Sequence, residues 1–239
     1  MFDPAPNSRY LDKFGWLLFL TYGSIAAQSL VNVQDEYSGL GPELGNLVAV
    51  LVASAMLVLA MQASGVNRHW RIGIWITILI SLSAHILAVG LRIVSDRPLG
   101  LANMATIPLG ALALSVLSFF FVIHRLLRHR RVTASTLLGA ITAYLFIPLS
   151  FYYAFLVVDG LTSAPFFGSP RPGPEFMFFS LTTVTTLGYG DLVPLNNFGE
   201  LLATTEALLG QLYLVVVVAL IVGLMASGWQ NARPSRTDQ

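Results

Sequence analysis

The sequence predicts an all-α membrane protein with six membrane-spanning helices. Its 239 residues are 55% hydrophobic and only 10% charged, and their mean hydropathy is +0.72. A soluble domain carries about 25% charged residues, so this chain has too few to cover a surface that faces water. The apolar residues fall into six stretches, each close to the roughly 20 residues that a helix needs to cross the hydrocarbon core of a bilayer.

The six stretches are bounded by glycine, proline or charged residues. In chain order they run from Phe14 to Val31, Leu44 to Ser64, Trp70 to Leu91, Met104 to Leu127, Thr136 to Val158 and Gly199 to Gly228. A further apolar segment, Glu175 to Val184, is too short to span. Such a segment is tolerated at membrane depth only where protein or water surrounds it, so we expect a re-entrant helix there. The chain is expected to divide into a four-helix N-terminal module (1–131) and a second domain (132–239).

Charged residues predict the orientation. Counting six spans places most of the arginine and lysine on one side, together with both termini, and most of the acidic residues on the other. The basic side receives Arg9, Lys13, Arg68, Arg71, Arg125, Arg128, Arg130, Arg131, Arg233 and Arg236. Because loops rich in arginine and lysine stay in the cytoplasm, we expect a multi-pass protein of the cell membrane with both termini cytoplasmic. The re-entrant segment then opens to the outside.

Composition also argues against several functional classes. The net charge of +1 gives no broad basic surface for nucleic acid, and the absence of cysteine excludes disulfides and thiolate metal sites. The four histidines are too scattered to suggest a metal site. The spans show no pairing of a nucleophile with a base and no phosphate-binding loop. We therefore expect neither an enzyme nor a bound cofactor.

The most informative segment runs from Thr182 to Asp191 and reads TTVTTLGYGD. A cation that leaves water needs replacement oxygen atoms, which backbone carbonyls can supply. Successive carbonyls point at one axis only if the backbone alternates between ordinary and left-handed dihedral angles. Glycine reaches the left-handed region without steric cost, so Gly188 and Gly190 are expected to adopt it. Thr186 would add a hydroxyl oxygen.

Residues 186–190 resemble the Thr-Val-Gly-Tyr-Gly selectivity filter of tetrameric potassium channels, with Leu187 in place of valine. The resemblance covers about residues 136–228, as outer helix, pore helix, filter and inner helix. It implies that K⁺, the permeant ion, binds the carbonyl oxygens of Thr186, Leu187, Gly188 and Tyr189, with Gly190 completing the filter. Because one chain holds one such segment, enclosing an ion requires a homotetramer around a central pore, embedded in lipid.

The resemblance also implies roles for neighbouring residues. Those expected to support the filter or to form its outer mouth are Phe178, Phe179, Thr182, Thr185 and Asp191. The two phenylalanines would form an aromatic collar against Tyr189. Thr182 occupies the position at which some family members carry a carboxylate. Asp191 would either concentrate cations at the outer mouth or form a hydrogen bond behind the filter.

Four residues of the sixth stretch are candidates for a part in gating: Glu206, Gly210, Gln211 and Gly223. An ionisable residue at membrane depth is a functional candidate by default, but Glu206 also fits a glutamate that is simply hydrogen-bonded between helices. Gly210 matches the hinge glycine of many family members, and Gly223 offers a second flexible point. Gln211 faces either the central cavity or a neighbouring helix.

A conventional voltage sensor is not expected. It needs several arginines inside the membrane field, since one charge moved through 100 mV supplies only about 2.3 kcal/mol. Residues 104–123 carry no charge, and Arg125, Arg128 and Arg131 lie at the cytoplasmic end. The expected function is passive, potassium-selective conduction. The alternatives are a voltage-modulated channel with a non-standard sensor and a non-conducting modulatory subunit of a heteromeric channel.

Overall fold

The computed structural model describes residues 8–30, 41–64, 68–94, 108–128 and 134–231. In chain order the helices are α1 (Ser8–Leu30), α2 (Gly41–Ser64), α3 (Arg68–Val94), α5 (Leu109–Arg128), α6 (Ala134–Leu161), α7 (Gly173–Val184) and α8 (Asn197–Asn231). These residues contain no strand, and loops connect α6 to α7 and α7 to α8. The predicted all-α class is confirmed for the described part of the chain.

Local sequence explains where α7 and α8 begin. Pro172 is the N-cap of α7 and Pro174 lies in its first turn, where a missing N–H costs no helical hydrogen bond. Before α8, the side-chain Oδ1 of Asn196 accepts a hydrogen bond of 2.6 Å from the backbone N–H of Gly199. Asparagine is one of the preferred residues for this capping role. Both starts are therefore fixed by local sequence, that of α7 after the loop from α6 and that of α8 after the loop from α7.

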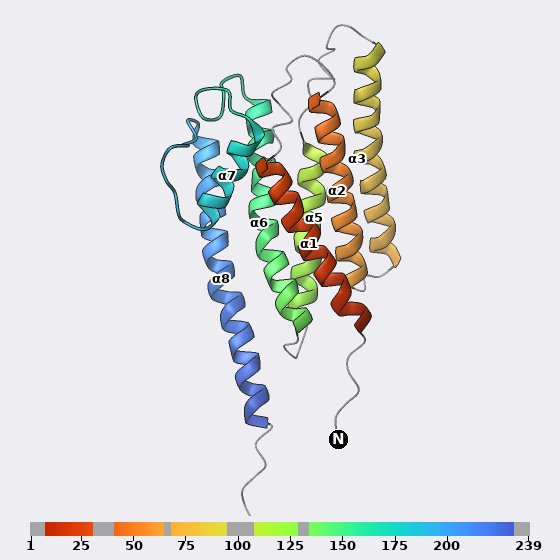
Figure 1. Cartoon of the computed structure of the whole chain (residues 1–239), viewed down its shortest axis with the longest axis vertical. Coiled ribbons are helices and arrows are strands. Elements are labelled where there is room, and N and C mark those ends of the chain that lie inside the picture. Colours follow the sequence, from red (N-terminus) through yellow and green to blue (C-terminus); the bar gives the residue numbers. More distant parts are fainter. Residues whose placement is uncertain (1–7, 31–40, 65–67, 95–107, 129–133, 232–239) are drawn as a thin grey trace, which may run out of the picture.

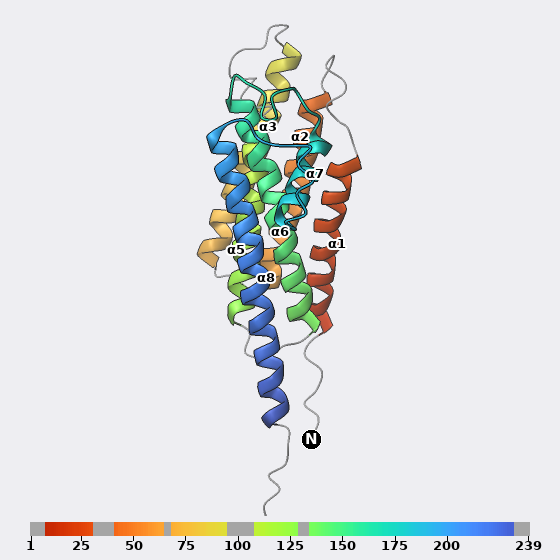
Figure 2. The ribbon, with the colours of Figure 1, turned by 90° about the vertical axis from the view of Figure 1, so that its left-hand side faces the viewer.

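Helix α6 lies at the centre of the arrangement. It contacts α1 and α5 as well as α7 and α8, and it runs side by side with α5 (Figure 1). Helix α2 packs against α1 and α5, while α3 packs outside against α2 and α5. Helix α8 contacts α6 and α7 and stands at one edge of the molecule, so it lies in front when the molecule is viewed from that side (Figure 2).

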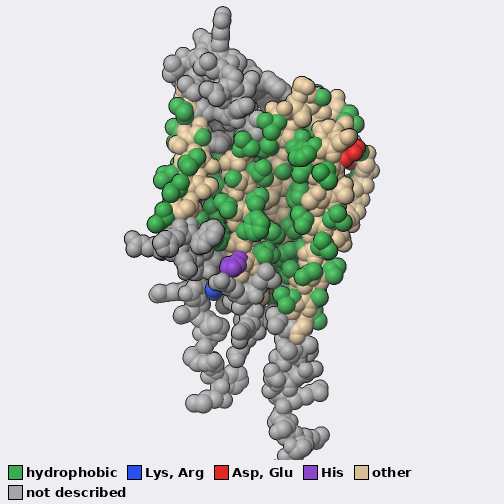
Figure 3. Space-filling model, turned by 180° about the vertical axis from the view of Figure 1, so that it is seen from behind, with side chains coloured by type: hydrophobic (Ala, Val, Ile, Leu, Met, Phe, Trp, Pro, Cys, Tyr) green, Lys and Arg blue, Asp and Glu red, His purple; other side chains and the backbone are tan. Residues whose placement is uncertain are grey.

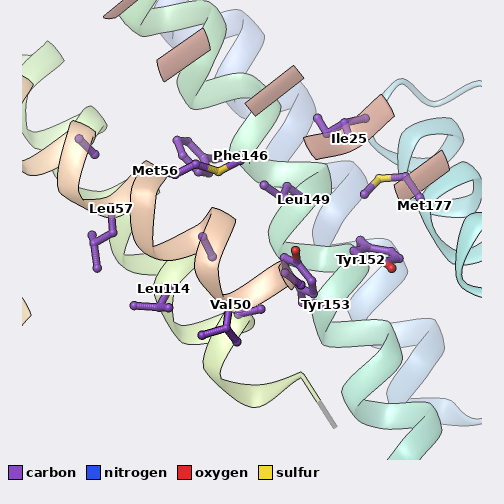
Figure 4. Packing of buried hydrophobic residues seen from close by; sticks show 14 of the residues in the cluster. Ile25, Val50, Met56, Leu57, Leu114, Phe146, Leu149, Tyr152, Tyr153 and Met177 are labelled. Carbon is purple, nitrogen blue, oxygen red and sulfur yellow. The ribbon is translucent and has the colours of Figure 1, made fainter. Parts of the chain in front are cut away.

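One hydrophobic core joins α7 to the longer helices (Figure 4). Its almost completely buried side chains include Leu17 of α1, Leu57 of α2, Leu114 of α5, Phe146 of α6 and Met177 of α7. Burying a side chain of this size contributes about 1.5–3 kcal/mol relative to leaving it exposed in water. The short helix is therefore fixed by the same packing that holds the bundle together.

The outer surface is apolar across its middle. On the face shown in Figure 3, hydrophobic side chains spread over the central zone, and the coloured charged side chains lie toward the two ends. Large exposed hydrophobic residues occur on several helices, including Trp16 of α1, Trp75 of α3, Phe120 of α5 and Leu212 of α8. A surface of this kind is suited to lipid, and the chain is a membrane protein.

Three helices of the described residues are long and apolar enough to cross a membrane: Leu109–Leu126 in α5, Thr136–Leu161 in α6 and Asn197–Val217 in α8. The apolar parts of α2 and α3, Leu47–Gln62 and Ile72–Ala84, are shorter. Six complete spans therefore stay a prediction. The predicted domain boundary at 131/132 and four of the basic residues behind the predicted orientation (Arg130, Arg131, Arg233 and Arg236) lie outside the described residues.

Candidate functional site

Helix α7 has 12 residues, fewer than a span requires. Helices α1, α6 and α8 all contact it, and Phe176, Met177 and Ser180 on its inner side are buried. Its observed bounds extend the predicted segment, 175–184, by two residues at the start. A short apolar helix enclosed by longer ones has the surroundings that a re-entrant helix needs.

Aromatic side chains hold α7 and the loop before it against α6. Phe155 of α6, Phe166 and Phe167 of the loop, and Phe176 and Phe179 of α7 form one cluster, with neighbouring ring centroids 4.8–6.3 Å apart. Aromatic pairs at such distances stabilise packing beyond the area that they bury. Phe179 was expected to lie against Tyr189, but in the structure it belongs to this cluster behind α7.

Two hydrogen bonds of Phe166 tie the two loops together. Its backbone N–H donates to Oδ1 of Asp159 over 2.8 Å, and its carbonyl oxygen accepts from the N–H of Leu195 over 3.0 Å. Asp159 lies in the last turn of α6, whereas Leu195 lies in the loop between α7 and α8. Phe166 therefore joins the loop before α7 to the loop before α8.

The backbone of residues 186–190 alternates in the way that carbonyl ligation requires. The angle φ is +57° at Thr186, +45° at Gly188 and +80° at Gly190, so every second residue lies in the left-handed region. The two glycines have the conformation expected of them. Thr186 was not expected to share it, because a β-branched residue with positive φ is strained by about 1–3 kcal/mol. Strain of this kind is concentrated at functional sites.

The end of α7 fixes the start of this segment through two carbonyls, and that of Thr183 accepts a hydrogen bond of 2.9 Å from the N–H of Thr186. The oxygen of Thr182 accepts hydrogen bonds from the N–H of Leu187 over 2.8 Å and from the N–H of Gly188 over 3.2 Å. The hydroxyl of Thr182 donates to the carbonyl of Phe179 over 3.0 Å, and that of Thr185 donates to the carbonyl of Leu181 over 2.7 Å. Thr182 and Thr185 thus support the segment through the last turn of α7.

Tyr189 lies flat against α7. Its ring stacks on that of Phe178, with centroids 5.8 Å apart and an interplanar angle of 5°. Of the two phenylalanines that were expected to form the aromatic collar, Phe178 therefore contacts Tyr189 within the chain. Residues 185–191, which include Leu187 and Asp191, are all exposed in the single chain. One chain leaves this segment uncovered and cannot surround an ion.

Glu206 of α8 is completely buried and reaches α7, not solvent. Its Oε1 lies 2.5 Å from the hydroxyl of Ser180, which also lies 2.8 Å from the carbonyl oxygen of Pro148 in α6. The Ser180 hydroxyl therefore joins three helices. Ser180 was missed from the sequence, although it is the one polar residue in the apolar run 176–181 and this could have drawn attention to it.

The two glycines of α8 have different surroundings. A Cβ atom at Gly210 would lie 2.7 Å from Cγ2 and 2.8 Å from the carbonyl oxygen of Val184, whereas a Cβ at Gly223 would have no neighbour within 4 Å. Helix α8 continues without a break through both positions. Gln211 is exposed. Gly210 thus permits α8 to approach the end of α7 closely, whether or not it acts as a hinge.

The last turns of α5 contact α6 and α8. Leu126 of α5, Ala140 of α6 and Val217 of α8 form a small buried cluster. Beside it, the hydroxyl of Tyr213 donates a hydrogen bond of 2.6 Å to the carbonyl oxygen of Ala140. Arg125, which directly precedes Leu126 of this cluster, is half-buried and its Nε has no hydrogen-bond partner within the described residues. The side chain of Arg128 and all of Arg131 lie outside the described part.

Comparison with known proteins agrees with this geometry. A family model described as "Ion channel" matches residues 132–227. Over 49 residues the chain is 47% identical to potassium voltage-gated channel protein shk-1 of Caenorhabditis elegans, and over 53 residues it is 45% identical to the inward rectifier potassium channel Kirbac3.1 of Paramagnetospirillum magnetotacticum. These matches cover 20% and 21% of this chain, and only 9% and 18% of the two relatives.

Residues 132–227 are therefore an ion channel domain. This part of the chain belongs to the class of membrane channels rather than to the enzymes. Within this class, the matched segment belongs to the potassium channel family.

Proposed function

We propose that this chain is the subunit of a potassium-selective channel that conducts K⁺ passively through a pore shared by four copies. The observation that carries the proposal is the alternation of left-handed φ angles at residues 186, 188 and 190. This backbone turns successive carbonyls toward one side. The carbonyl oxygens of Thr186, Leu187, Gly188 and Tyr189, repeated in four chains, then replace the water around a dehydrated K⁺.

The uncovered surfaces of the single chain support the tetramer. Leu187 and Tyr189 are 57% and 66% exposed, and on α8 the exposed apolar residues include Leu201, Leu208 and Val215. These residues belong to the segment and the helix that would line the central pore and face the neighbouring subunits. Asp191, at the outer end of the filter, would attract cations to the mouth. The proposal places six spans in the cell membrane, with both termini in the cytoplasm.

Reconstitution tests the proposal. The purified protein is placed in liposomes with K⁺ and Na⁺ gradients in opposite directions, and the reversal potential is measured against protein-free liposomes. We expect it to follow the K⁺ gradient, and we expect native mass spectrometry to give four chains per particle. Equal permeation of Na⁺ would overturn selectivity. A folded tetramer that passes no ion would instead favour the non-conducting modulatory subunit.

We further propose that gating does not depend on a conventional voltage sensor. Arg125 lies near the end of α5, and the remainder of this helix carries no acid or base apart from His124 and Arg128. Replacing Arg125, Arg128 and Arg131 together with glutamine is expected to leave the dependence of current on voltage unchanged in planar bilayers. A loss or shift of voltage dependence in this variant would favour the alternative of a non-standard sensor.

A further inference from the structure

The contact among Pro148, Ser180 and Glu206 contains two short distances between oxygen atoms. Ser180 Oγ lies 2.8 Å from the Pro148 carbonyl oxygen and 2.5 Å from Glu206 Oε1. Both distances are those of O–H···O hydrogen bonds, and each such bond needs a proton between its oxygens. The serine hydroxyl carries only one proton, and a carbonyl oxygen can only accept. The second proton must therefore come from Glu206.

The ionised alternative fits the geometry less well. If Glu206 were a carboxylate, the serine proton would point to Oε1, and Ser180 Oγ would face the Pro148 carbonyl oxygen at 2.8 Å with no proton between them. Glu206 Oε2 is also buried without a hydrogen-bond partner in the described residues. A buried charge without pairing is far more costly than a buried neutral acid.

Among the described residues, the groups around Glu206 supply no compensating charge. Tyr144 of α6 is the titratable side chain that interacts electrostatically with it, and residues 176–184 of α7 contain no acidic, basic or tyrosine side chain. In the described part of the chain, the side-chain partner of Glu206 is Ser180. A neutral acid needs no counter-ion, and one hydrogen-bond acceptor satisfies its proton.

We propose that Glu206 is a protonated carboxylic acid that donates to Ser180, whose hydroxyl in turn donates to the Pro148 carbonyl, so that α7 is locked between α6 and α8. The inference rests on the proposed function and assigns Glu206 a positioning role within it. Ser180 lies two residues before Thr182, whose carbonyl holds the N–H groups of Leu187 and Gly188. This lock therefore maintains the filter in its conducting conformation.

The test uses the full chain in liposomes with three variants and one control. Glu206→Gln keeps a neutral donor of the same shape, Glu206→Ala removes it, and Ser180→Ala removes the relay. We expect the K⁺ flux of Glu206→Gln to stay within about threefold of wild type, and those of Glu206→Ala and Ser180→Ala to fall by about tenfold. Thr205→Val, which removes a hydroxyl bonded to the Leu201 carbonyl of its own helix, is the control and should conduct normally.

Infrared spectroscopy distinguishes a protonated Glu206 from a residue that only fills space, because it detects the proton on the carboxyl group. At neutral pH the wild type should show the C=O stretching band of a protonated carboxylic acid, and Glu206→Gln should lack it. Identical spectra in this region would overturn the inference, as would a Glu206→Gln variant as defective as Glu206→Ala, or a fully active Ser180→Ala. A wild type that conducts no K⁺ would refute the proposed function, while the spectra would still decide the protonation of Glu206.

Discussion

Replacing Gly188 with alanine is expected to abolish K⁺ conduction. Gly188 has φ of +45°, and an L-residue in the left-handed region costs about 1–2 kcal/mol. Four copies in the proposed tetramer raise the cost to about 4–8 kcal/mol, so we expect K⁺ flux below about 1% of wild type. A Cβ at this position would have no neighbour within 4 Å in the chain. The expected loss therefore comes from the backbone conformation, which aims the carbonyl oxygens.

The control for this substitution is Gly73→Ala on α3. A Cβ at Gly73 also meets nothing within 4 Å, but the residue lies inside a helix, where alanine is favoured over glycine by about 1 kcal/mol. Gly73→Ala should conduct like the wild type. Liposome flux measurements on the two variants separate an effect of filter geometry from a general effect of an added methyl group. Normal flux through Gly188→Ala would show that residues 186–190 do not bind the ion.

Replacing Gly210 with alanine is expected to destabilise the protein and to lower its K⁺ flux. The new methyl group would meet Cγ2 of Val184 at 2.7 Å and the Val184 carbonyl oxygen at 2.8 Å, and a backbone atom cannot move aside as a side chain can. Overpacking of this kind costs about 1–3 kcal/mol. It exceeds the gain of about 1 kcal/mol or less from the better helix propensity of alanine. Because Val184 ends α7, the displacement acts directly on residues 186–190, the proposed filter.

Gly223→Ala is a matched control on the same helix. Its Cβ meets nothing within 4 Å, so only the favourable change in helix propensity remains. Thermal unfolding in detergent should place Gly210→Ala below the wild type by about 2–4 °C for each kcal/mol lost, and Gly223→Ala at or above it. If both variants had the same melting temperature, the close approach of α8 to α7 would not limit the stability of the protein.

The sequence predicts the helices well because their signals are local. The re-entrant helix was expected at 175–184 and is found at 173–184, and the last helix, expected at 199–228, is found at 197–231. Proline, glycine and capping residues mark these ends, and long apolar runs leave few alternatives to a helix. The left-handed glycines of the filter follow from the same kind of local argument, because few other residues tolerate that conformation.

The features that escaped prediction depend on residues that are distant in the sequence. Ser180 is separated in the sequence by 26 positions from Glu206 and by 32 from Pro148. No periodic pattern in the sequence predicts a contact between residues so far apart. The left-handed φ of Thr186 was missed for a different reason. The side chain of this residue argues against positive φ, and only the surrounding structure can hold it there. Within one chain Phe178 contacts Tyr189 and Phe179 does not, because adjacent residues of a helix point in different directions; a part of Phe179 in supporting the filter stays a prediction.

The connection between α5 and α6 has a consequence for assembly. Residues 129–133 are all that separate two helices that pack along each other. In the proposed tetramer, each N-terminal module (residues 1–131) would then remain beside the second domain (residues 132–239) of its own chain, because so short a link cannot carry it across to another. If the proposed tetramer is assembled from a mixture of normal and mutant chains, a damaged N-terminal module would therefore first affect the quarter of the pore that its own chain forms.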